Sequence, residues 1–280
     1  MERDDPLPSW RAGGTRDALE AFLAAAEEVP VADRVAYFDN DGTLWCERPS
    51  YVQLDFFLDA LRKHVAKDPS TGERAEFAAA AREFMGRATH PTLGRPTRSV
   101  TYQPMLELIA ELRRRDFTVG IVTGGGTEFV RAISDDFYGV PAELVVGTLI
   151  GYDVSRDGEG PPVIRRTSGL LGVANEGSAK VANIQTQLGR RPILAAGNSG
   201  GDREMLEWAQ ATGSPSLALL IDHDDAEREF HYTSEAGTFV ETEPITDVGA
   251  RLGWTVVSMA RDWEVVFPPE SLMLERERPG

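Results

Sequence analysis

Residues 38–45 read Phe38-Asp39-Asn40-Asp41-Gly42-Thr43-Leu44-Trp45 and follow directly on the apolar run Val35-Ala36-Tyr37. A short run that is apolar at every position is typical of a strand buried on both faces, as in a parallel sheet. In an open α/β sheet the carboxyl ends of the strands face the ligand crevice. The stretch therefore predicts a central parallel strand that delivers two aspartates to a site.

Two aspartates two positions apart meet the chemical needs of phosphoryl transfer. Asp39 can attack phosphorus and form an acyl phosphate, and Asp41 can protonate the leaving oxygen and then activate water. Gly42 allows a turn sharp enough for backbone N–H groups to reach phosphate oxygens. A simple turn is the alternative for this motif alone, because Asp, Asn and Gly are favoured turn residues. We set aside an EF-hand calcium loop, whose glycine stands at the sixth position instead of the fourth.

Three further apolar runs have the length of buried strands: residues 118–122, 192–196 and 217–221. Helical patterns lie between them, at residues 104–115, 178–188 and 202–210. This alternation predicts an α/β fold with a Rossmann-like, doubly wound parallel sheet as its core. Residues 254–259 predict one more strand. Residues 16–28 predict an amphipathic helix, which we expect to follow a loose N-terminal arm.

The interval between the first and second predicted strands is far longer than one crossover helix requires. It contains two helical patterns, residues 51–67 and 73–87, which we interpret as a small α-helical cap inserted after the first strand. Residues 145–167 alternate and turn through Asp157-Gly158-Glu159-Gly160, which predicts a β-hairpin. Residues 222–230 are expected to form an acidic helix that contains His223.

Three more segments offer groups to the same site. Thr123-Gly124-Gly125-Gly126-Thr127 ends the second strand and presents a hydroxyl and free N–H groups to an anion. Lys180 stands at the start of a predicted helix, where a lysine taken alone is typically solvated. Gly197-Asn198-Ser199-Gly200-Gly201-Asp202 closes a buried strand and presents oxygen ligands for a hard cation such as Mg²⁺.

The order of these four segments along an α/β chain resembles that of the haloacid dehalogenase-like (HAD) hydrolase superfamily. Within that superfamily it is most similar to the phosphoserine-phosphatase-like branch, which has a helical cap. The resemblance extends from about Val35 to Ile221. It implies a hydrolase core formed by residues 15–46 and 101–275, and a helical cap formed by residues 47–100.

The resemblance also implies roles for single residues. Asp39 would be the nucleophile and a Mg²⁺ ligand, and Asp41 the general acid/base, which would bind Mg²⁺ through its backbone carbonyl. Thr123 and the N–H of Gly124 would hold the transferring phosphoryl group. Lys180 would neutralise charge on Asp39 and the phosphate, so that two like-charged groups can approach.

The resemblance also implies which residues contact the substrate. Gly42 and Thr43 are expected at the phosphate. Glu47 and Arg48 stand where related phosphatases recognise the non-phosphate end of the substrate, with a solvent-exposed salt bridge as the alternative.

Asn198 and Asp202 would complete the metal site, but family members commonly carry Gly-Asp where this chain has Gly197-Asn198. One negative charge fewer predicts weaker metal binding, and either Asn198 or Asp202 is left as the direct ligand.

Composition limits the partners. The 280 residues contain 29 Lys and Arg against 45 Asp and Glu, which gives a net charge of -16. Such a surface repels nucleic acids and anionic membranes, so we expect neither as a partner. The single cysteine, Cys46, excludes an intramolecular disulfide and is expected to pack in the interior. The N-terminal residues lack the pattern of a secretory signal, which predicts a cytoplasmic location.

The function predicted from these features is Mg²⁺-dependent hydrolysis of a small phosphorylated metabolite, a phosphate monoester, through an aspartyl-phosphate intermediate. A phosphotransferase would use the same site with another acceptor. A 2-haloacid dehalogenase also attacks with an aspartate but needs no acid/base two residues later, so Asp41 favours phosphate esters. A receiver-type signalling module would lack the cap insertion. A non-catalytic phosphate-binding protein remains an alternative, and Asn198 is the one feature that suggests it.

Overall fold

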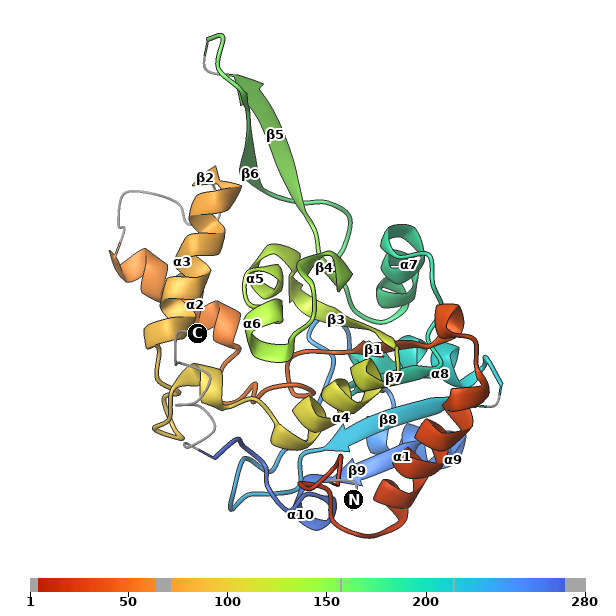
Figure 1. Cartoon of the computed structure of the whole chain (residues 1–280). Coiled ribbons are helices and arrows are strands. Elements are labelled where there is room, and N and C mark those ends of the chain that lie inside the picture. Colours follow the sequence, from red (N-terminus) through yellow and green to blue (C-terminus); the bar gives the residue numbers. More distant parts are fainter. Residues whose placement is uncertain (1–4, 64–71, 157, 214, 270–280) are drawn as a thin grey trace.

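The structure is a computed structural model that describes residues 5–63, 72–156, 158–213 and 215–269. Its centre is a six-stranded parallel sheet in the order β4-β3-β1-β7-β8-β9 (Figure 1). The strands are β1 (Val35–Phe38), β3 (Thr118–Gly126), β4 (Val145–Thr148), β7 (Leu194–Gly197), β8 (Leu217–Asp222) and β9 (Thr255–Ser258). Strand order reverses beside β1, which makes its carboxyl end a topological switch point. The predicted doubly wound α/β core is confirmed.

Alternate residues of β1 belong to two hydrophobic cores, one on each face of the sheet. Ala36 and Phe38 lie in the larger core and Val35 and Tyr37 in the smaller one, because successive strand side chains point to opposite faces. Helices α1 (Gly14–Ala25) and α4 (Gln103–Arg114) contribute to the larger core. Helices α7 (Ser178–Gln187), α8 (Arg203–Gln210) and α9 (Ile245–Leu252) contribute to the smaller core.

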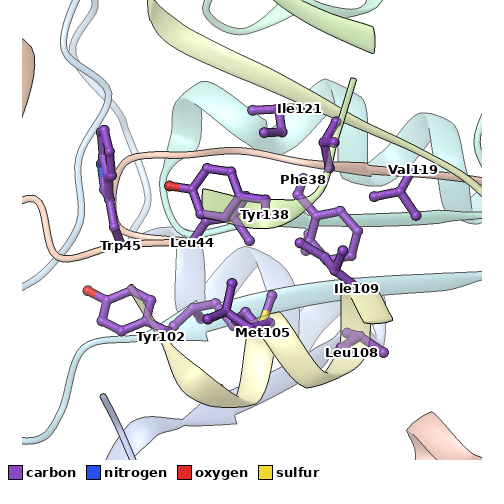
Figure 2. Packing of buried hydrophobic residues seen from close by; sticks show 14 of the residues in the cluster. Phe38, Leu44, Trp45, Tyr102, Met105, Leu108, Ile109, Val119, Ile121 and Tyr138 are labelled. Atoms are coloured by element: carbon purple, nitrogen blue, oxygen red, sulfur yellow. The ribbon is translucent and has the colours of Figure 1, made fainter. Parts of the chain in front are cut away.

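Helix α4 shows how the local sequence sets an element of the fold. Pro104 stands in its first turn, where no backbone N–H is required, and Arg114 lies in its last turn, where a cation complements the helix dipole. Met105 and Ile109 are fully buried and point toward Phe38 of β1 (Figure 2). This packing holds the strand that carries the two aspartates.

The insertion after β1 is not purely helical. It contains α2 (Val52–Lys63) and α3 (Arg74–Arg87), as expected, but also the short strand β2 (Gly72–Glu73). Residues 64–67 of the predicted first helix lie outside the described residues. Strand β2 pairs with the hairpin formed by β5 (Ile150–Arg156) and β6 (Pro162–Leu170), so three strands and two helices make up the region above the sheet.

The hairpin itself starts later than the sequence pattern predicted. Residues 145–148 form β4 and pair with β3 in the parallel sheet, so the hairpin begins at Ile150. It projects away from the body of the protein (Figure 1). Midway along β6, the guanidinium carbon of Arg166 lies 3.5 Å from the centre of the Phe77 ring of α3, which joins the hairpin to the helical part of the insertion.

Two expectations about the remaining segments are wrong. Described residues of the N-terminal arm are packed: Leu7 and Trp10 are buried, and Trp10 Nε1 donates to the carbonyl of Pro104. Residues 223–230 form turns instead of an acidic helix. The His223 ring is buried and stacks against Tyr232. This tertiary contact outweighs the helical tendency that the charge pattern suggested.

Three short helices, α5 (Thr127–Arg131), α6 (Ser134–Tyr138) and α10 (Met259–Asp262), complete the layers together with single-turn 3₁₀ segments. Within the described part of the chain, no helix has both the length and the apolar character needed to cross a bilayer.

Candidate active site

Residues from four segments meet at the carboxyl edge of three neighbouring strands. Asp39 and Asp41 follow β1, Thr123 lies near the end of β3, and Asn198 follows β7. Lys180 reaches this edge from the first turn of α7. Parallel strands place their carboxyl ends together, so the sequence motifs become neighbours although they lie far apart in the chain.

Lys180 is the centre of a buried ionic cluster. Its Nζ donates to Asp39 Oδ1 and to Asp202 Oδ1, each at 2.5 Å, and to the carbonyl oxygen of Val122 at 2.9 Å. The side chain of Lys180 is 2% exposed, so the interpretation as a solvated lysine is wrong. Three acceptors satisfy all three ammonium hydrogens, which fixes the position of the charge.

The cluster holds more negative than positive charge. Burial raises the pKa of Asp39 well above its ordinary value, Asp202 and Asp41 act in the same direction, and Lys180 opposes them. Burial also opposes ionisation of Lys180, yet its attraction to Asp202 and Asp39 raises its pKa. One ammonium thus contacts two acidic side chains while Asp41 adds to the repulsion on Asp39, and a bound cation would relieve that repulsion.

Asp41 has contacts suited to a group that carries a proton. Its Oδ1 accepts a hydrogen bond from Trp45 Nε1 at 2.9 Å, and its Oδ2 lies 3.4 Å from Thr123 Oγ1. Burial raises the pKa of Asp41, and the hydrogen bonds from Trp45 and Thr123 lower it only in part. A carboxylic acid with a raised pKa at the edge of a pocket matches the expected acid/base.

The glycine-rich end of β3 lies beside Asp41. Thr123 Oγ1 accepts the N–H of Gly125 at 2.9 Å, and the N–H of Gly126 donates to Gln53 Oε1 of α2 at 2.7 Å. A side chain of the inserted region therefore reaches down to the loop that was expected to hold phosphate. Gln53 was not singled out from sequence, because only the tertiary structure brings α2 over β3.

Asp202 is occupied by the protein itself. Its Oδ1 faces Lys180, and its Oδ2 accepts the backbone N–H groups of Asn198 and Ser199 at 3.0 and 3.1 Å. This arrangement is a capping box, in which Ser199 and Asp202 satisfy the start of the helical segment after β7. Asn198 is 2% exposed, and its Oδ1 lies 3.4 Å from Thr43 Oγ1.

Gly42 is required by the close approach of Asn198. Its φ is +72°, a conformation that favours glycine, and a Cβ added to it would lie 2.0 Å from Asn198 Nδ2. The turn after β1 and the loop after β7 are therefore in direct contact. The carbonyl of Gly42 also faces His223 Nε2 at 2.8 Å, which supports the turn from behind.

The oxygen groups at this edge fit a hard cation. The Asp39 carboxylate, the Asp41 backbone carbonyl and the Asn198 amide oxygen are the types of ligand that Mg²⁺ prefers. Within residues 5–63, 72–156, 158–213 and 215–269, no group of three or more His, Cys, Asp or Glu side chains is arranged to hold a metal. A site here would therefore combine carboxylate, carbonyl and amide oxygens, and the unbalanced negative charge would favour a cation.

Glu47 and Arg48 do not form a salt bridge with each other in the described structure. Glu47 is 8% exposed, and its Oε1 accepts from Tyr232 OH at 2.8 Å and from Asn198 Nδ2 at 3.1 Å. Burial raises the pKa of Glu47, and the Tyr232 hydrogen bond opposes that shift. Arg48 is exposed and stacks over the Tyr232 ring at 4.4 Å.

A pocket of about 330 Å³ opens above these residues. Asp39, Asp41, Glu47, Asn198 and Gly124 are among the residues that line it. The lining also includes residues that the sequence motifs did not indicate: Tyr51, Gln53, Leu54, Phe57, Glu176 and Glu235. Gln53, Leu54 and Phe57 belong to α2, whose polar and apolar pattern gave no signal for them, since an amphipathic helix presents the same pattern whether it covers a core or a pocket.

Cys46 belongs to a separate buried cluster behind the site. Its Sγ contacts Glu229 Oε1 at 2.9 Å, and Tyr102 OH donates to the same oxygen at 3.0 Å. Burial raises the pKa of the Cys46 thiol, which argues against a nucleophile. Cys46 is thus a packed interior residue, as expected.

The fold and this arrangement define a class of α/β proteins that hold two aspartates and a lysine at the switch point of a parallel sheet. The chain belongs to the haloacid dehalogenase-like hydrolases, since the model of that family matches residues 36–207, more than half of its length. The resemblance read from the motifs is confirmed at the level of the family. No curated protein matched the chain.

Several solved structures are similar to this one. A conserved protein of unknown function from Anaerococcus prevotii DSM 20548 is 18% identical with a TM-score of 0.43, over 66% of this chain and 49% of that chain. This chain thus spans about half of the Anaerococcus protein. A phosphoserine phosphohydrolase-like protein from Francisella tularensis subsp. tularensis SCHU S4 is 13% identical with a TM-score of 0.38, over 78% and 99% of the two chains. A HAD family hydrolase from Salmonella enterica subsp. enterica serovar Typhi is 13% identical with a TM-score of 0.39, over 74% and 67%.

Proposed function

We propose that this HAD-like hydrolase is a Mg²⁺-dependent phosphatase that cleaves a small phosphate monoester through an aspartyl-phosphate on Asp39. The observation that carries the proposal is the placement of Asp39 and Asp41 on one pocket, with Lys180 held 2.5 Å from Asp39. Asp39 supplies an attacking carboxylate, Asp41 supplies a proton, and Lys180 offsets the negative charge of an approaching phosphate.

We assign the metal to Asp39, the backbone carbonyl of Asp41 and the amide oxygen of Asn198. Asp202 supports this set indirectly, because both of its oxygens are engaged by Lys180 and by backbone N–H groups. When bound, Mg²⁺ would stabilise the negative charge that gathers on the phosphoryl oxygens. Of the two candidates that the sequence left open, we therefore propose Asn198 as the direct ligand, because both oxygens of Asp202 are already engaged.

In the first step, one Asp39 oxygen forms a bond to phosphorus as the bond from phosphorus to the ester oxygen breaks. The proton of Asp41 passes to that leaving oxygen, so an alcohol departs and Asp41 becomes a carboxylate. Thr123 and the N–H of Gly124 hold the phosphoryl oxygens, and Lys180 stays paired with Asp39 and Asp202. The inserted helices narrow the pocket and limit the access of water.

In the second step, Asp41 takes a proton from a water molecule as the water oxygen attacks phosphorus. The bond between Asp39 and phosphorus breaks, phosphate leaves, and Asp39 is a free carboxylate again. Asp41 ends protonated and ready for the next ester. One residue serves as acid and then as base, as the raised pKa of Asp41 allows.

The pocket wall favours leaving groups without further negative charge. Glu47, Glu176 and Glu235 contribute carboxyl groups, and Leu54 and Phe57 contribute apolar surface. The described residues that line the pocket include no lysine or arginine to pair with an extra carboxylate or phosphate. We therefore propose small monoesters with neutral or cationic leaving groups as the substrate class. Phosphotransfer to an alcohol is the second candidate, because it uses the same residues with another acceptor.

The direct test is hydrolysis of p-nitrophenyl phosphate with and without Mg²⁺. We expect turnover in the presence of Mg²⁺ and a loss of at least about 100-fold after removal of divalent cations by a chelator, since metal stabilisation of transition-state charge is worth several kcal/mol. Added Mg²⁺ should restore the rate. Chloride release from 2-chloropropionate, with no release of phosphate from any ester, would contradict the proposal and identify a dehalogenase.

Asp41→Asn is expected to slow hydrolysis by roughly two to four orders of magnitude, the range for loss of general acid/base help. The acid must be protonated in the first step, so wild-type kcat/KM should fall as pH rises through the pKa of Asp41, which burial raises. The variant should lose that limb of the pH profile. A matched control is Asp55→Asn, which removes an aspartate that accepts from Ser50 outside the pocket. An unchanged basic limb in Asp41→Asn would assign the proton to another group.

A further inference from the structure

The Asn198 side chain is held by its nitrogen. Asn198 Nδ2 donates to Glu47 Oε1 at 3.1 Å and to Ser234 Oγ at 3.2 Å. An amide nitrogen has two hydrogens, so these two acceptors use both of them. The amide oxygen is consequently turned to the other side, where it lies 3.4 Å from Thr43 Oγ1 in the turn after β1. The three side chains Asn198, Glu47 and Ser234 are all buried.

Glu47 is an unusual acceptor for this amide because it is a buried carboxylate. Its hydrogen-bond partners among the described residues are Tyr232 and Asn198, both uncharged. Position 198 carries an amide where a carboxylate is common in the family, and the contacting residue carries a carboxylate. The acidic group therefore belongs to Glu47, which contacts Asn198, instead of to residue 198 itself.

We propose that Glu47 is the positioning residue of the metal site: it orients the Asn198 amide oxygen toward the cation and supplies the carboxylate that position 198 lacks. This inference rests on the proposed Mg²⁺ site. Groups that hydrogen-bond to a metal ligand fix its orientation and tune its affinity, and their loss commonly weakens metal binding 10- to 100-fold. Glu47 acts on the metal through Asn198 and Tyr232 orients Glu47 in turn.

Glu47→Gln should disturb this arrangement with little change in shape. A glutamine at position 47 can donate as well as accept, so the paired amides have two orientations, and one of them turns the nitrogen of Asn198 toward the cation. We expect the Mg²⁺ dissociation constant, measured by calorimetric titration with Mg²⁺ alone, to rise by about 10- to 100-fold. Heat denaturation of the metal-free protein checks that the variant is folded.

Glu235→Gln is the matched control. It removes a carboxylate from the same pocket, and no contact between Glu235 and Asn198 is seen in the described residues. We expect its Mg²⁺ affinity to stay within about 3-fold of the wild type, because an exposed charge is screened by solvent. An effect as large as that of Glu47→Gln would mean that total charge and not orientation controls the metal, and would overturn the positioning role.

Exchanging the two groups provides the sharpest test. Asn198→Asp alone places a second carboxylate against Glu47, and we expect a lower melting temperature of the metal-free protein because like charges then meet in a buried site. The double variant Glu47→Gln with Asn198→Asp moves the carboxylate to position 198 and the amide to position 47. It should regain Mg²⁺ affinity to within about 3-fold of the wild type, because an amide at position 47 can donate to and orient the carboxylate at position 198.

The outcomes separate this inference from the proposed function. A wild-type protein that binds no Mg²⁺ would overturn both. If the wild type binds Mg²⁺ and Glu47→Gln binds it with the same affinity, the positioning role of Glu47 is overturned but the proposed function is not. A change of KM for the ester in Glu47→Gln with unaltered Mg²⁺ affinity would assign Glu47 to the substrate, the role that the sequence had suggested. If the double variant binds Mg²⁺ no more tightly than Glu47→Gln alone, the positioning role of Glu47 is also contradicted.

Discussion

Asp39→Asn is expected to reduce the hydrolysis of phosphate monoesters by at least about four orders of magnitude, since removal of an enzyme's nucleophile commonly costs that much or more. An amide does not form the acyl phosphate, so the first step fails at the bond to phosphorus. The measurement is steady-state turnover of p-nitrophenyl phosphate at saturating Mg²⁺.

The fold of Asp39→Asn should remain intact, because Lys180 keeps its contacts with Asp202 and with the carbonyl of Val122. The change also removes a carboxyl group whose pKa is raised by burial and by repulsion from Asp202 and Asp41. We expect circular dichroism and the melting temperature to stay close to those of the wild type. Asp39→Ala serves as a second variant. Wild-type turnover in either one would refute the covalent mechanism.

A covalent intermediate also has a direct signature. Rapid acid quench of the wild type during turnover should yield a peptide containing Asp39 with the added mass of one phosphoryl group, and Asp39→Asn should not. Asp41→Asn, which lacks the base for the second step, is expected to retain more of this adduct per enzyme than the wild type. A label on any other residue would redirect the assignment of the nucleophile.

Lys180→Met is expected to have the largest effect on stability, about 3–5 kcal/mol at neutral pH, the usual cost of removing one partner from a buried ion pair. Methionine replaces most of the aliphatic stem but leaves Asp39 and Asp202 facing each other without a cation. It also leaves the carbonyl of Val122 without its donor. The measurement is chemical denaturation of wild type and variant under the same ionic conditions.

The stability penalty of Lys180→Met should depend on pH. Burial and like charge raise the folded-state pKa of Asp39 above its unfolded value. Lys180 opposes this shift, so its removal raises the folded-state pKa further, and the variant loses more stability than the wild type as pH rises above the unfolded pKa of about 4. The penalty should therefore be smaller at pH 5 than at pH 8. A penalty that does not change with pH would point to lost packing as the cause.

A double variant isolates the role of charge. Asp202→Asn combined with Lys180→Met removes the unpaired carboxylate, and its amide can still accept from the N–H of Asn198 and donate to Asp39. We expect it to recover a large part of the lost stability without recovering activity. Recovery of neither would show that Lys180 acts through its aliphatic stem.

Local sequence determined the main architecture of this protein. Residues 35–38 are apolar at every position because β1 is covered on both faces, and the same reasoning located β3, β7, β8 and β9. The four motifs were found because the chemistry of phosphoryl transfer restricts the residue types and the strand ends restrict their places. The family followed from their order, and the match over residues 36–207 confirms it.

The secondary structure of segments that pack against residues distant in the chain could not be predicted from the local sequence. Residues 145–148 were read as part of a hairpin, yet they extend the parallel sheet because β3 offers a free edge to them. Residues 223–230 have the charges of an exposed helix, yet His223 packs on Tyr232 and forms part of the interior. In both cases contacts made across the fold outweigh the local pattern.

The contact between Asn198 and Glu47 shows the same division at the scale of single atoms. The sequence revealed that Asn198 stands where an acidic residue is common, and it implied a loss of negative charge. Only the fold brings Glu47, 151 positions away, to 3.1 Å from the Asn198 amide. Hydrogen bonds and charges act over a few ångströms in space and are indifferent to separation along the chain, so the pairing of β1 with β7 decided that the segments carrying Glu47 and Asn198 would meet.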